Sequence, residues 1–121
     1  MDKLNTNYFY GNEAEQFDFI EIPKELVVSE EFSSVSMDAK LLYGMMVDRM
    51  GLARKNLWID EDNHVYIIYP VDTMSEEMNM SKRKITELLK ELDQIGLIER
   101  VRLGRGFPDR IYVKNFNARM N

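Results

Sequence analysis

The sequence predicts an α+β fold, mainly helical, with a winged helix-turn-helix and an additional small hairpin. Its 121 residues suit one domain. Residues 71–78 predict a short helix, which a three-residue turn separates from a longer helix starting after Ser81. Residues 97–103 and 110–114 then read as two strands, with glycine and proline in the turn between them. This order of segments is typical of a helix-turn-helix followed by a β-hairpin wing.

The helix after Ser81 has clear ends and one apolar face. Ser81 is a favourable N-cap residue, and Gly96 is a favourable residue just beyond the helix C-terminus. The apolar residues at helical spacing are Ile85, Leu88, Leu89, Leu92 and Ile95. Basic residues occupy its N-terminal end, where free N–H groups and the macrodipole favour anionic ligands. We therefore interpret this segment as a recognition helix.

The segments before it predict a buried helical scaffold. Residues 17–22 are expected to form a short strand or an extended lead-in, and Pro23 suits the start of a short helix over 24–28. Ser36 should cap a helix that runs from Met37 to about Ala53 and is apolar nearly all round. Such a helix belongs at the centre of the core. The methionines favour adaptable core filling over a soft-metal thioether site.

A polar turn between two β-like runs predicts the small hairpin, over residues 58–60 and 65–69. Asp60, Asp62 and His64 in that turn resemble alternating calcium ligands. The glycine and the distal glutamate of a calcium loop are absent. We therefore expect no metal site there.

The charge of the chain is unevenly distributed. The net charge is −5, yet residues 1–81 carry 6 Lys and Arg against 16 Asp and Glu, whereas residues 82–121 carry 10 against 5. Association with a polyanion depends on local potential, so a DNA-binding surface should lie in the last third. The alternative is a basic face that is merely solvated.

DNA recognition needs cations on phosphates and side chains at base edges. Arg83 is the first choice for a contact with O6 and N7 of guanine, because two N–H donors of its guanidinium group match these two acceptors. Thr86 suits a base edge or a methyl group, Lys84 a phosphate, and Arg105 at the wing tip the backbone or minor groove. The other predicted contacts are Lys82, Lys90, Arg102 and Arg110. In the alternative interpretation, Lys84 pairs with Glu87 or Glu91, and Lys90 pairs with Glu87.

Other function classes find little support. With one histidine, no cysteine and no Gly-x-Ser-x-Gly motif, we expect no enzyme, no cofactor and no metal. No apolar run approaches the roughly 18 residues of a membrane span, and no signal peptide is present, so we expect a cytoplasmic protein without membrane partners. The competing hypothesis is a winged-helix protein-interaction module, whose basic face docks an acidic partner, or a transcriptional regulator.

Residues 1–16 are expected to form an N-terminal arm. Three adjacent aromatic residues, Tyr8, Phe9 and Tyr10, lie in this otherwise polar stretch and need a covering surface. That surface belongs either to their own domain or to a second copy of the chain. These residues are therefore the candidates for dimerisation.

The order of motifs over residues 19–116 resembles the N-terminal domain of RepA-type replication initiators (the RepA_N family) of plasmids from low-GC Gram-positive bacteria. The motifs that carry it are Ile22-Pro23, Ser36-Met-Asp-Ala-Lys-Leu-Leu-Tyr-Gly44, Asp48-Arg-Met50, Lys55-Asn-Leu-Trp-Ile-Asp60, Val65-Tyr-Ile-Ile-Tyr69, Leu88-Leu-Lys-Glu-Leu92, Ile95-Gly-Leu-Ile-Glu-Arg100 and Arg110-Ile-Tyr-Val-Lys-Asn-Phe116. The resemblance implies a winged helix that binds double-stranded DNA at repeats in a plasmid replication origin, generally as a homodimer.

The resemblance also assigns parts of the chain. It places the DNA-facing residues at the helix start, from Ser81 to Thr86, and in the wing at 104–108. Residues 17–116 would be the DNA-binding domain, and 117–121 a tail leading to an absent C-terminal domain that recruits host replication machinery. Leu57 departs from the family pattern, because glycine is common there before the tryptophan.

Overall fold

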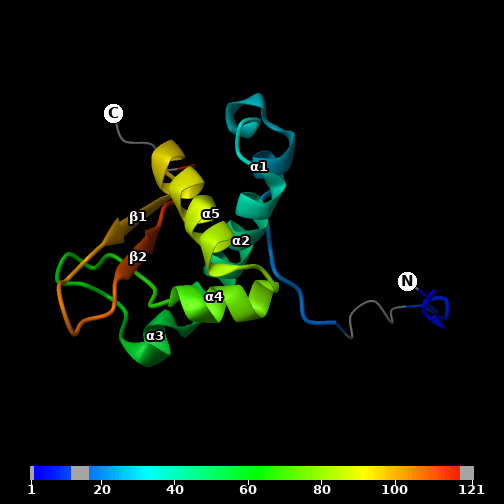
Figure 1. Cartoon of the computed structure of the whole chain (residues 1–121), viewed down its shortest axis with the longest axis horizontal. Coiled ribbons are helices and arrows are strands. Elements are labelled where there is room, and N and C mark those ends of the chain that lie inside the picture. The colour runs from blue at the N-terminus through cyan, green and yellow to red at the C-terminus, as the bar shows by residue number, and fades with distance from the viewer. Residues whose placement is uncertain (1, 12–16, 118–121) are drawn as a thin grey trace.

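A computed structural model of the chain describes residues 2–11 and 17–117. Within these residues a series of helices is followed by a pair of strands (Figure 1). They are α1 (Lys24–Val28), η2 (Glu30–Phe32), α2 (Met37–Arg49), η3 (Met50–Leu52), α3 (Ala53–Asn56), α4 (Val71–Met78), α5 (Lys82–Ile95), β1 (Ile98–Val101) and β2 (Arg110–Val113), where η marks a short 3-10 helix. The predicted α+β fold is confirmed.

Helix α5 packs against both α2 and α4 (Figure 1). Its side chains Ile85, Leu88, Leu89 and Leu92 are completely buried. Each such burial stabilises the fold by about 1.5–3 kcal/mol. The predicted start and stop are confirmed, since Ser81 is the N-cap and Gly96 (φ 88°) lies at the C-cap in the left-handed conformation.

Helix α2 is shorter than predicted and less uniformly buried. It begins after the Ser36 cap as expected, but it ends at Arg49, and the chain continues as η3 and α3. Met37 is 61% exposed and Leu41 38% exposed, so one edge of the helix faces solvent. The prediction that α2 is buried nearly all round was wrong for this edge.

The residues leading into α1 pass close to α2. Residues 17–22 are extended and form no strand. A Cβ added to Gly44 would lie 2.6 Å from Cγ1 of Ile22. Gly44 therefore permits the close approach of this segment to α2.

The turn of the helix-turn-helix has the predicted length. Helix α4 ends at Met78, and the following C-cap residue, Asn79, adopts φ 54° and ψ 45°, a left-handed conformation that asparagine tolerates. The Met80 amide donates to the Ser75 carbonyl, and the Ser75 hydroxyl donates to the Met80 carbonyl. These bonds redirect the chain into Ser81 and α5.

The wing is an antiparallel pair, in which Ile98 lies opposite Val113 and Val101 opposite Arg110. Its strands have four residues each and are shorter than predicted. Ile67 pairs with the free side of β2 in a single-residue bridge, in which it exchanges two backbone hydrogen bonds with Ile111. The wing is thereby attached to the segment that precedes α4.

The small hairpin forms with little regular pairing. Ile59 and Val65 make one isolated bridge, and the Tyr66 amide donates to the Trp58 carbonyl. Leu57 enters it with φ 56° and ψ 39°, in the left-handed region that disfavours side chains. The glycine that the resemblance leads us to expect at this position would adopt this conformation without steric strain.

The arm contains no helix or strand in its described part, residues 2–11, and all of these residues are exposed. Figure 1 shows them away from the helices. The remaining predicted arm residues, Met1 and 12–16, and the tail residues 118–121 lie outside the described part of the chain. No helix in the described part is long and apolar enough to cross a membrane.

Candidate nucleic-acid interface

The exposed face of α5 lies opposite its buried leucines and carries polar residues along its length. Arg83 is more exposed than Lys82 and Lys84, with 92% of its side chain accessible against 66% and 42%. Thr86 and Lys90 are also exposed, as predicted for groove-facing residues. Glu87 and Gln94 lie on the same face, because they follow Arg83 and Lys90 by four residues each.

Each of the three cations at the start of α5 lies beside a carboxylate. Lys82 Nζ is 3.0 Å from Asp72 of α4, and Lys84 Nζ is 3.6 Å from Asp38 of α2. Arg83 Nε is 3.8 Å from Glu87 of its own helix. Lys82 and Lys84 therefore lie toward opposite flanks of the helix, and Arg83 lies between them on the exposed face.

The alternative pairings expected for Lys84 and Lys90 were wrong. Glu87 pairs with Arg83. Both carboxylate oxygens of Glu91 accept hydrogen bonds from Ser36, one from its amide and one from its hydroxyl, each at 2.8 Å. Glu91 thereby joins the N-terminus of α2 to the middle of α5 and fixes the position of the recognition helix.

Two hydroxyls at the start of α5 make bonds within the helix. The Ser81 hydroxyl accepts from the Lys84 amide at 3.1 Å, which is the capping bond. The Thr86 hydroxyl donates to the Lys82 carbonyl at 2.9 Å. With its hydroxyl proton engaged, Thr86 is better suited to present its methyl group, or to accept a hydrogen bond, than to donate one.

The wing loop exposes two arginines on a glycine-containing turn. Gly104 (φ 108°) and Gly106 (φ 88°) both adopt conformations that disfavour side chains. Arg102 and Arg105 are exposed and make no ion pair within the described part of the chain. Phe107, which lies in the wing segment 104–108 that the resemblance assigns to DNA, is 66% exposed. The loop can therefore offer both charge and an apolar surface to a partner.

Arg110 differs from the other wing arginines because its side chain is engaged within the protein. Its guanidinium lies 4.5 Å from the centroid of the Tyr66 ring. A hydrogen bond with Tyr112 raises the pKa of Arg110. Tyr112 in turn donates to Asp60 Oδ2 at 2.8 Å. Arg110 thus joins the wing to the small hairpin, and its predicted contact with DNA stays a prediction.

Asp60 organises the turn of the small hairpin. Its Oδ1 accepts from the amides of Asp62 and His64, each at 2.9 Å. These backbone bonds, with that from Tyr112, lower the pKa of Asp60. Possible ligand atoms of Asp60, Asp62 and His64 lie within 4.8 Å of one another. Because both oxygens of Asp60 already accept hydrogen bonds, the cluster is accounted for as the support of a turn.

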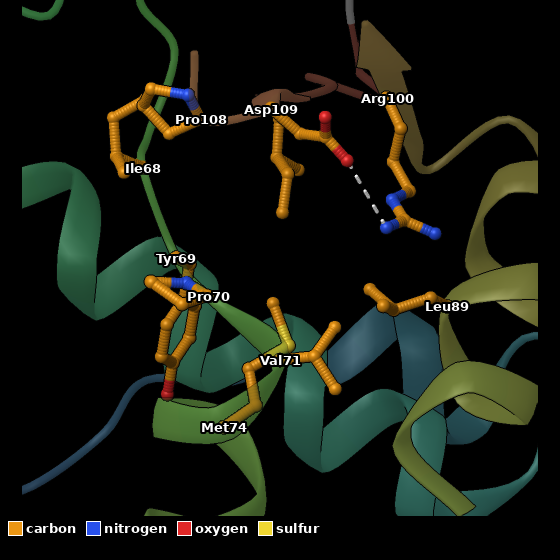
Figure 2. Close-up of a pocket in the computed structure, with 10 residues that line it drawn as sticks. Ile68, Tyr69, Pro70, Val71, Met74, Leu89, Arg100, Pro108 and Asp109 are labelled. Carbon is orange, nitrogen blue, oxygen red and sulfur yellow. Dashed lines mark ion pairs between the residues drawn. The ribbon is translucent and has the colours of Figure 1, made fainter. Parts of the chain in front are cut away.

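A pocket of about 150 Å³ lies where the helix-turn-helix meets the wing. Figure 2 shows the ion pair of Arg100 and Asp109, 3.5 Å apart, on one side and Met74, Val71 and Leu89 on the other. Leu89 and Met74 are fully buried core residues. The pocket therefore lies between packed inner faces, away from the exposed face of α5.

Sequence reasoning missed several residues of this surface. Glu87 was considered only as a partner for lysines, although its spacing from Arg83 placed it on the exposed face. Asp38 and Asp72 carry no local signal that pairs them with the lysines of α5, because those contacts depend on the tertiary fold.

A protein family and a curated protein match this chain in sequence. Residues 18–121 match the family described as replication initiator protein A (RepA) N-terminus. A "41 kDa protein" of Lactobacillus helveticus is 31% identical over 101 residues, which cover 78% of this chain and 29% of that protein. The chain thus spans under a third of the length of this relative.

Solved structures agree with this assignment. One described as the N-terminal domain of a DNA-binding protein has a TM-score of 0.76 and 32% identity, over 92% of this chain and 85% of that one. A structure described as a Rep–DNA complex has a TM-score of 0.76 and 33% identity, over 90% of this chain and 84% of that one. The structure of an "MDR initiator" has a TM-score of 0.73 and 29% identity, over 90% of this chain and 86% of that one. These matches, with the winged helix-turn-helix described above, confirm the expected resemblance. This chain belongs to the family of replication initiator protein A (RepA) N-terminal domains.

Proposed function

We propose that this chain is the DNA-binding domain of a plasmid replication initiator and recognises repeats in the replication origin as double-stranded DNA. The observation that carries the proposal is the form of α5. Its apolar face is completely buried, and its opposite face exposes Arg83, Thr86 and Lys90 beside an arginine-bearing wing. A similar Rep domain has been solved as a complex with DNA.

In the proposed complex α5 enters the major groove with its N-terminal half. Arg83 contacts guanine O6 and N7, and the methyl group of Thr86 contacts a thymine methyl or a base edge. Lys82, Lys84, Lys90 and the Ser81 hydroxyl contact phosphates or base edges next to them. Arg102 and Arg105 reach the backbone or the adjacent minor groove from the wing, with Arg110 at its base. None of these contacts requires a cofactor or covalent chemistry, so the proposed role is not enzymatic.

Binding titrations at two salt concentrations test the proposal. If roughly 4–6 phosphates are neutralised per protomer, log K should fall with log salt with a slope of about −4 to −5. Affinity for an origin-repeat duplex should exceed that for a scrambled duplex of the same composition. If the chain binds no duplex in a salt-dependent way, the fold serves protein interaction instead.

We also propose that the chain forms a homodimer through its arm. Tyr8, Phe9 and Tyr10 are 83%, 62% and 64% exposed, so they offer a large aromatic surface. Phe9 packs edge-on against Phe17, with ring centroids 5.8 Å apart. A variant lacking residues 1–12 should sediment as a smaller species than the whole chain. An unchanged oligomer would remove these residues from the interface.

Two further features belong to the proposal for the whole initiator. Recruitment of host replication machinery would fall to a C-terminal domain beyond the residues of this chain. The protein would act in the cytoplasm, where a plasmid origin is accessible.

A further inference from the structure

We propose that Glu87 selects a base. In this proposal its carboxylate accepts a hydrogen bond from the N4 amino group of a cytosine in the major groove, next to the guanine that Arg83 contacts. The inference rests on the proposed function, because it assigns a reader to the same helix face. It concerns a residue that the charge pattern alone would exclude from DNA binding.

Glu87 lies in the middle of the exposed face of α5. It follows Arg83 by one helical turn and precedes Lys90 by three residues, and its side chain is 58% exposed. The buried side chains Ile85, Leu88 and Leu89 lie on the opposite side of the helix. Any duplex that brings Arg83 into its major groove therefore brings the Glu87 carboxylate in beside it.

The other carboxylates near the helix start have roles within the fold. Glu91 accepts two hydrogen bonds from Ser36, while Asp38 and Asp72 lie on neighbouring helices and pair with the flanking lysines. Within the residues that the structure describes, Glu87 forms an ion pair with Arg83 alone, at a distance of 3.8 Å, which is longer than a hydrogen bond. Its oxygens can therefore accept a new donor without breaking a bond that holds α5 in place.

Arg83 can keep this neighbour while it reads a guanine. The atom of Arg83 that faces Glu87 is Nε. The two terminal amino groups of the guanidinium carry further donors, which can reach O6 and N7 of a guanine. One ion pair on the helix can therefore present a donor fork and an acceptor to neighbouring bases.

A carboxylate in the groove is repelled by the phosphates, so it favours only sequences that offer it a donor. Cytosine presents its N4 amino group in the major groove with no acceptor on the same base edge. Adenine presents N6, but its N7 acceptor lies alongside and repels a carboxylate. Guanine and thymine present acceptors there. Glu87 should therefore disfavour most sequences and tolerate cytosine.

A panel of repeat duplexes, each with one base pair changed, tests the inference with the whole chain. Wild type, Arg83→Ala, Glu87→Ala and Glu87→Gln are compared by equilibrium binding at one salt concentration. Asp93→Asn is the matched control, because it removes one negative charge from an exposed position of the same helix. Thermal melting checks that each variant folds.

Glu87→Ala should reduce discrimination at one C·G pair by roughly tenfold, and that pair should differ from the one affected by Arg83→Ala. Its affinity for a scrambled duplex should rise. Glu87→Gln should move the preference at that pair toward A·T, since glutamine suits N6 and N7 of adenine. Asp93→Asn should leave the base preferences unchanged.

Three outcomes would overturn the inference. If Glu87→Ala affects the same base pair as Arg83→Ala, Glu87 only orients the arginine. If it changes no base preference, or behaves as Asp93→Asn does, its effect is general electrostatics. If the wild type itself does not distinguish repeat from scrambled duplexes, the proposed function fails and this inference fails with it.

Discussion

The recognition helix α5 and the wing present basic residues in two different ways. Lys82, Arg83 and Lys84 at the start of α5 each lie beside a carboxylate, on a helix whose apolar face is buried and whose ends are capped. Arg102 and Arg105 extend from an exposed loop between short strands, with no ion pair in the described part of the chain. The helix presents its cations on a backbone that is packed against the core, whereas the wing presents its cations on an exposed loop.

This difference suits two parts of DNA recognition. Base edges demand side chains held in one orientation, and phosphates demand only a nearby cation. The carboxylates beside α5 form exposed pairs with its cations, and such pairs contribute only about 0–1 kcal/mol, so phosphate can replace them. We therefore expect α5 to determine which sequence binds and the wing to add affinity for any sequence.

The largest expected difference between the two regions is in stability. Leu88 of α5 is completely buried, so Leu88→Ala should lower the free energy of unfolding by about 2–5 kcal/mol. Leu103 at the wing is 43% exposed, so Leu103→Ala should change the free energy of unfolding by less than about 1 kcal/mol. Urea denaturation of both variants measures the difference.

Equal losses for the two leucines would contradict the contrast between a helix whose apolar face is buried and a wing loop whose leucine is partly exposed. Leu103→Ala also serves as the control for composition, since both variants lose the same atoms. Unchanged m-values in the two denaturation curves would show that the variants differ in stability and not in the unfolded state.

Much of the fold could be predicted because its signals are local. Ser81, Gly96 and the spacing of the buried leucines define α5 within the sixteen residues 81–96, and the structure has the helix there. The turn at Asn79 and the glycines of the wing likewise follow from backbone conformations that few residues adopt. The limits of α2 were less clear, since its methionine-rich sequence continues past Arg49 into η3.

The interface was harder to predict because its contacts join distant residues. In the alternative interpretation Glu91 could pair with Lys84, seven residues earlier on the same helix, yet it binds Ser36, which is 55 residues distant. The chain of Arg110, Tyr112 and Asp60 joins the wing to the small hairpin across a similar separation. Helical spacing identifies which residues share a face, but it does not identify what packs beside that face.

The measurement that tests the division of roles most directly is the affinity ratio for repeat over scrambled duplex. We would measure it for wild type, Arg83→Ala, Lys84→Ala and Arg105→Ala at one salt concentration. Arg83→Ala should lower the ratio by roughly five- to 150-fold, equivalent to about 1–3 kcal/mol. Lys84→Ala and Arg105→Ala should weaken both duplexes alike and leave the ratio unchanged. If Arg83→Ala also weakens both duplexes equally, α5 does not read sequence through Arg83, and the account is contradicted.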